Sequence, residues 1–137
     1  MKYILTSKHS VPDAIDRLTA ALLARQFGVL HIHDLNKTLN GKGVPFKPEC
    51  RILEVCNPQQ AFKVLSDDID LNMALPCRVS VYEKNGKTCI GMISPKGMLQ
   101  ALSDSPHLAE VADEVESTLK AAMDEAAYVL VRDSFSC

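Results

Sequence analysis

The segment CRVSVYEKNGKTCIGMIS, residues 77–94, consists of two alternating apolar runs separated by Asn85 and Gly86. An Asn-Gly pair in this position is the strongest short-range signal of a β-hairpin, because a type I′ turn needs positive φ angles at both of its central residues. Counting outward from the turn pairs Tyr82 with Cys89. The predicted hairpin has a core face and a mixed face, made respectively by Val79, Val81, Ile90 and Met92 and by Arg78, Ser80, Tyr82, Cys89 and Ile93.

Three further strands are predicted before the hairpin, over residues 2–6, 29–33 and 51–56. Helices are predicted to begin where a capping side chain is followed within two residues by proline. The four capping residues are Ser10, Asn57, Ser94 and Ser105. A short helical turn is also expected after Asp34.

The expected order of elements, β-α-β-β-α-β-β-α, predicts an α+β fold with two layers. We expect a mainly antiparallel sheet with helices on one face. Residues 1–137 are long enough to bury a full core and are predicted to form a single domain.

Composition argues against several classes of function. Fifteen Lys and Arg against seventeen Asp and Glu give a net charge of -2, and the basic residues do not cluster. Binding to nucleic acid or to an anionic membrane needs a concentrated positive surface, so neither partner is expected. No apolar run approaches about 18 residues and the N-terminus resembles no signal peptide, which predicts a cytoplasmic protein.

The cysteines suggest one candidate site. Five cysteines without a CxxC motif predict reduced thiols. If strand 51–56 runs antiparallel beside the first hairpin strand, Cys56 and Cys77 share one edge of the sheet. Extending the hairpin pairing places Ser94 opposite Cys77, so two helix N-termini, at Asn57 and Ser94, are expected to converge there.

Such an edge predicts a ligand-binding pocket formed by Cys56, Asn57, Cys77 and Ser94. Helix N-termini attract anions and lower the pKa of a nearby thiol, so we expect a small anionic or sulfur-containing ligand. The alternative is structural, because free cysteine packs as a small hydrophobe.

Metal and cofactor sites have weaker signals. His31 and His33 lie on one face of their strand, as metal-binding pairs do, but their spacing relative to the cysteines matches no zinc-finger pattern. We expect them to cover a solvated or subunit-facing surface, and we predict no metal and no cofactor. No serine triad or phosphate-binding loop can be recognised, so catalytic residues are not assigned.

Three functions fit these features. The first is a small-ligand or sulfur-species binding module with a pocket at Cys56 and Cys77. The second is a structural or interaction homodimer formed through the mixed sheet face around Tyr82. The third is a thiol-dependent transferase or redox protein, although no general base beyond Glu54 lies near Cys56 in sequence.

Three stretches of sequence resemble a known family. RILEVCNPQQAFKVL, ALPCRVSVYEKNGKTCIGMISPKGML and FGVLHIHDLNKTLNGKGVPFKP are similar to the motifs of the domain of unknown function 302 family, and the similarity extends over about residues 10–125. Its Cys-Asn-Pro and Leu-Pro-Cys motifs match residues 56–58 and 75–77. The resemblance implies a fold similar to the TATA-binding-protein half-domain, frequent homodimers and a link to sulfur metabolism. His31 and His33 depart from the usual family pattern.

Overall fold

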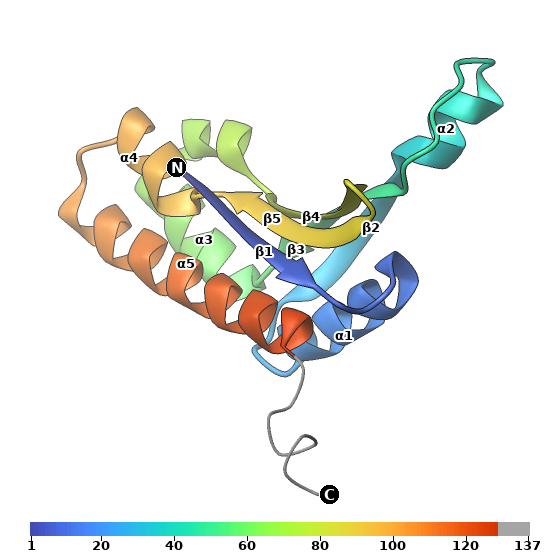
Figure 1. Cartoon of the computed structure of the whole chain (residues 1–137). Coiled ribbons are helices and arrows are strands. Elements are labelled where there is room, and N and C mark those ends of the chain that lie inside the picture. The colour runs from blue at the N-terminus through green and yellow to red at the C-terminus, as the bar shows by residue number, and fades with distance from the viewer. Residues whose placement is uncertain (129–137) are drawn as a thin grey trace, which may run out of the picture.

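Five strands form one antiparallel sheet in the computed structural model, which describes residues 1–128 (Figure 1). The order across the sheet is β1-β5-β4-β3-β2. The strands are β1 (Lys2–Ser7), β2 (Gly28–Asp34), β3 (Cys50–Cys56), β4 (Cys77–Lys84) and β5 (Lys87–Ile93). The predicted α+β class with an antiparallel sheet is confirmed.

The helices begin at the predicted positions. They are α1 (Val11–Leu23), α2 (Leu35–Gly41), α3 (Pro58–Asp67), α4 (Pro95–Leu102) and α5 (Pro106–Ala127). The predicted side chains cap α1, α3, α4 and α5 by accepting a hydrogen bond from a backbone N–H in the first turn, and Asp34 caps α2 in the same way. Helices α1, α3 and α5 lie together on one side of the sheet (Figure 1).

A short 3-10 helix, η1 (Ile69–Ala74), was not predicted. Asp68 caps η1 by accepting a hydrogen bond from the Asp70 N–H. A Leu75–Pro76 peptide bond in the cis form then leads into β4.

The hairpin has the predicted turn, because Asn85 and Gly86 both have positive φ angles, of 54° and 73°. Tyr82 pairs with Cys89 as expected, but the β4–β5 ladder extends only as far as the pair of Ser80 with Gly91. The predicted pairing of Cys77 with Ser94 is therefore wrong.

Strand β1 explains why that pairing is absent. Ile93 pairs with Lys2 of β1, and the Ser94 N–H donates to the Met1 carbonyl. The end of β5 therefore pairs with β1 and separates from the start of β4. Cys77 instead pairs on its other side, with Val55 of β3.

The core lies between the sheet and its helices. One sheet face supplies aliphatic side chains that are completely buried, among them Leu53, Val55, Val79, Val81 and Ile90. Helices α1 and α5 supply Leu18, Leu22, Leu119 and Met123. The predicted core face of the hairpin is confirmed.

Two further expectations concern membrane-spanning helices and the state of the cysteines. Among residues 1–128, no helix is both long enough and apolar enough to cross a membrane. Cys50, Cys56, Cys77 and Cys89 are free thiols, whereas the fifth cysteine, Cys137, lies outside the described residues.

Replacing Leu53 should reveal how much the central strand contributes to stability. Leu53 is 0% exposed, so Leu53→Ala should lower the free energy of unfolding by about 2–5 kcal/mol through lost burial and a cavity. Leu30→Ala is the matched control, because Leu30 is 64% exposed and its truncation should change stability by less than about 0.5 kcal/mol. Urea unfolding followed by circular dichroism measures both changes; equal losses would contradict this description of the core.

Candidate functional site

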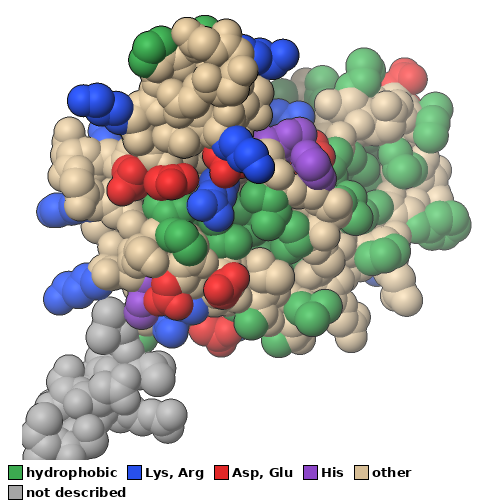
Figure 2. Space-filling model, turned by 90° about the vertical axis from the view of Figure 1, so that its right-hand side faces the viewer, with side chains coloured by type: hydrophobic (Ala, Val, Ile, Leu, Met, Phe, Trp, Pro, Cys, Tyr) green, Lys and Arg blue, Asp and Glu red, His purple; other side chains and the backbone are tan. Residues whose placement is uncertain are grey.

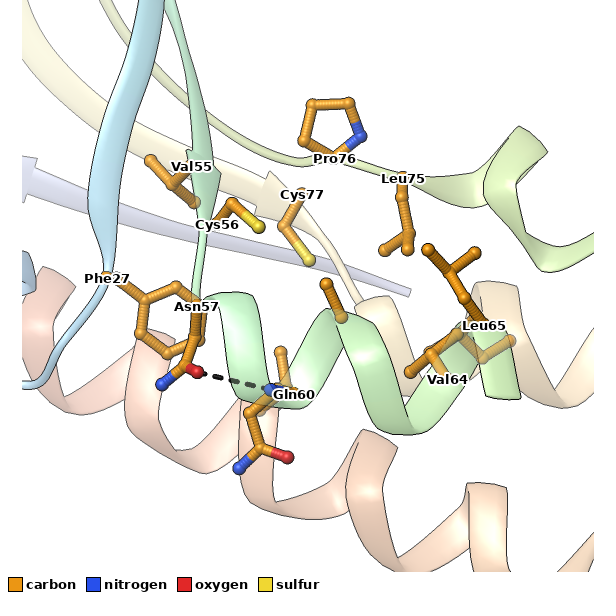
Figure 3. Close-up of a pocket in the computed structure, with 13 residues that line it drawn as sticks. Phe27, Val55, Cys56, Asn57, Gln60, Val64, Leu65, Leu75, Pro76 and Cys77 are labelled. Atoms are coloured by element: carbon orange, nitrogen blue, oxygen red, sulfur yellow. Dashed lines mark hydrogen bonds between the residues drawn. The ribbon is translucent and has the colours of Figure 1, made fainter. Parts of the chain in front are cut away.

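A cavity of about 200 Å³ lies where β3 ends, β4 begins and α3 covers the sheet (Figure 3). Cys56, Asn57 and Cys77 line it together, as predicted. Apart from Gln60, the rest of its wall is apolar and includes Phe27, Val55, Val64, Leu75 and Leu99. The cavity reaches the surface, because the lining residues Cys56, Asn57, Gln60, Leu75 and Cys77 are only half-buried.

Strand pairing brings the two cysteines together. Val55 is the direct partner of Cys77 across the β3–β4 ladder, and Cys56 follows Val55 as the last residue of β3. Both thiols are half-buried, and both side chains extend into the space above α3 in Figure 3. The predicted proximity of Cys56 and Cys77 at one sheet edge is confirmed.

The start of α3 is closed by its own cap. The Asn57 side-chain oxygen accepts hydrogen bonds from the Gln59 and Gln60 N–H groups at 3.0 and 3.1 Å. These are two of the backbone donors that a helix N-terminus otherwise offers to an anion. With these donors already engaged and no cationic side chain among the described residues that line it, the cavity is better suited to a neutral ligand than to an anionic one.

The expectation that the helix terminus lowers the thiol pKa is wrong. Burial raises the pKa of Cys56. Burial, and then the charge of Cys56, raises the pKa of Cys77 to about 11. Loss of hydration in the apolar cavity disfavours the thiolate more than the helix terminus favours it, so both cysteines are protonated thiols at neutral pH.

Ser94 does not line the cavity, although Leu99 of the same helix does. Its hydroxyl caps α4 by accepting from the Gly97 N–H and donates to the Glu116 carboxylate of α5. Burial alone would raise the pKa of Glu116, but hydrogen bonds from Ser94, Lys120 and the Lys96 N–H together lower it. Ser94 thus joins α4 to α5, and the two helix N-termini do not converge on the thiols.

The two histidines lie on the sheet face that the helices leave uncovered. His33 Nε2 is 3.3 Å from Glu54 Oε1, and the rings of His31 and His33 meet edge to face with their centroids 4.4 Å apart. Arg78 contacts the other Glu54 oxygen at 3.8 Å. Within residues 1–128, no group of three or more His, Cys, Asp and Glu side chains is placed to hold a metal ion.

The apolar wall of the cavity was not predicted. Phe27 lies between α1 and β2, and Leu99 lies in α4. These residues come from segments far apart in the chain, so their meeting depends on tertiary packing. The one local signal was the Leu-Pro pair directly before Cys77, which places two apolar side chains at the strand entrance.

The raised pKa of Cys77 predicts slow alkylation at neutral pH. A thiol with a pKa of about 8.5 is roughly one-quarter thiolate at pH 8, whereas one with a pKa of about 11 is on the order of a thousandth thiolate. The iodoacetamide reaction of Cys77 should thus keep accelerating up to about pH 11, as measured by peptide mass spectrometry. The same protein in urea is the control and should level off near pH 8.5; a native profile that levels off there too would refute the assignment.

Comparison with known proteins places this arrangement in a family. The family model described as "Domain of unknown function DUF302" matches residues 3–126. The crystal structure of an uncharacterized conserved protein DUF302 from Bacillus stearothermophilus is 37% identical, with a TM-score of 0.86 over 91% of this chain and 97% of that chain. No curated protein matches the chain. The chain therefore belongs to the DUF302 family.

Proposed function

We propose that this protein is a small-ligand binding module whose cavity holds a neutral molecule beside Cys56 and Cys77. The observation that supports this most directly is the apolar cavity of about 200 Å³ that both thiols line. Closed apolar cavities of about 150 Å³ are large enough to bind benzene. The space therefore suits a compact ligand of about that size or slightly larger.

The lining also favours a particular chemistry. Protonated thiols are weakly polar and polarisable, and they sit among aliphatic side chains and the Phe27 ring. A neutral sulfur species, such as an alkyl sulfide, matches these neighbours without leaving a charge buried. Because no Asp, Glu or His within residues 1–128 lines the cavity to act as a general base, a thiol-dependent transferase is less well supported.

Toluene and dimethyl sulfide are suitable probes for the cavity. Both should shift the amide resonances of the lining residues in heteronuclear NMR spectra. Ala61→Leu places a larger side chain in the cavity from α3 and should weaken binding at least about tenfold, or ~1.4 kcal/mol. Ala101→Leu makes the same change at an exposed position of α4 and should leave binding unchanged. Absence of binding to the wild-type protein, or an equal response in both variants, would refute the proposed function.

A second function is supported by a different surface. The sheet face opposite the helices exposes Ile4 and Ile93, which are 48% and 53% exposed, alongside Arg78 and the His33–Glu54 pair. Hydrophobic side chains also gather, among charged ones, on the face of the molecule seen in Figure 2. Apolar side chains that share a face with both acidic and basic groups suit self-association, so we propose that two copies of this chain pair through the open sheet face.

Light scattering with size-exclusion chromatography can test the pairing. The wild-type protein should have twice the mass of one chain, and Ile93→Lys should shift it toward the monomer by burying a charge in the interface. Leu102→Lys is the matched control, because Leu102 is 54% exposed but lies on α4, away from the sheet face. A monomeric wild-type protein would exclude the homodimer and leave the ligand-binding proposal standing.

A further inference from the structure

The two thiols form a pair within one cavity. Cys56 ends β3, and Cys77 starts the adjacent strand β4 opposite Val55. In Figure 3 the Cys56 and Cys77 side chains lie near one another, above the first turns of α3. Both residues line the same cavity of about 200 Å³, so one small ligand can contact both sulfurs.

The surroundings restrict which ligand such a pair can bind tightly. Thiolates are soft ligands that select soft cations such as Cu(I), whereas Mg²⁺ and Ca²⁺ require oxygen ligands. Structural zinc needs four ligands, and among residues 1–128 no third His, Cys, Asp or Glu joins the two cysteines to complete such a set. A cation that is stable with only two sulfur ligands fits this donor set best.

We propose that Cys56 and Cys77 form a two-coordinate binding site for one Cu(I) ion. This inference rests on the proposed function, because it uses the same cavity. Binding breaks two S–H bonds, forms two S–Cu bonds and releases two protons to solvent. Neither copper nor sulfur changes oxidation state.

The charge of the complex is partly compensated by the fold. One monovalent cation and two thiolates carry a net charge of −1, which an apolar lining would disfavour. Helix α3 begins at Pro58, two residues after Cys56, so the positive end of its dipole lies beside the complex, although Asn57 already occupies two of its N–H groups. The apolar wall in turn keeps competing water and hard oxygen ligands away from the ion.

Anaerobic titration with Cu(I), in competition with bicinchoninate, tests the site. The wild-type protein should withdraw one Cu(I) per chain from the chelator, and Cys56→Ser and Cys77→Ser should each abolish this tight equivalent. Cys50→Ser and Cys89→Ser are the matched controls, because these thiols lie outside the cavity, and both should retain it. Circular dichroism checks that every variant is folded.

Two results would overturn the proposal. One is Cu(I) withdrawal that is unchanged in Cys56→Ser or in Cys77→Ser, and the other is Zn(II) binding as tight as Cu(I) binding at the same cysteines. The outcome of the Cu(I) titration can be distinguished from the outcome of the toluene-binding experiment. Cu(I) binding that fails while toluene still binds overturns only the metal site. Cu(I) binding that depends on both cysteines in a protein that does not bind toluene overturns only the neutral-ligand function.

Discussion

The antiparallel ladder between β3 and β4 is the constraint on which the rest of the structure depends. Because Leu53 pairs with Val79 and Val55 pairs with Cys77, the apolar side chains of both central strands point to the same face. A shift of one residue would turn that set toward solvent. The same register that closes the core also places Cys77 at the edge of the sheet beside Cys56.

Two opposing effects act on the pKa values of the thiols at that edge. The start of α3 provides a favourable field for a negative charge, yet Asn57 already occupies two of its N–H groups and apolar side chains surround the sulfurs. Desolvation dominates, so the pKa of each thiol rises. The site therefore differs from the reactive cysteines of thiol enzymes, which are partly exposed in electropositive surroundings.

The features that could be predicted from the sequence are those that depend on local chemistry. The Asn85–Gly86 turn, the helix starts at Ser10, Asn57, Ser94 and Ser105, and the proximity of Cys56 to Cys77 all follow from turn residues, caps and alternation. The position of Ser94 could not be predicted, because it depends on β1 pairing with the end of β5 from the opposite end of the chain. The thiol pKa values could not be predicted either, since the wall that raises them includes Phe27 and Leu99 from separate elements.

Two parts of the cavity wall are constrained very differently. The sheet side, with Val55 and Cys77, belongs to the ladder and cannot change size without disturbing the core. The helix side consists of Gln60, Ala61, Val64 and Leu65 along α3, whose backbone hydrogen bonds are satisfied within the helix. Substitutions on α3 can thus reshape the cavity while the thiol pair stays in place. Within this architecture, ligand preference is free to diverge along one ten-residue helix without a change of fold.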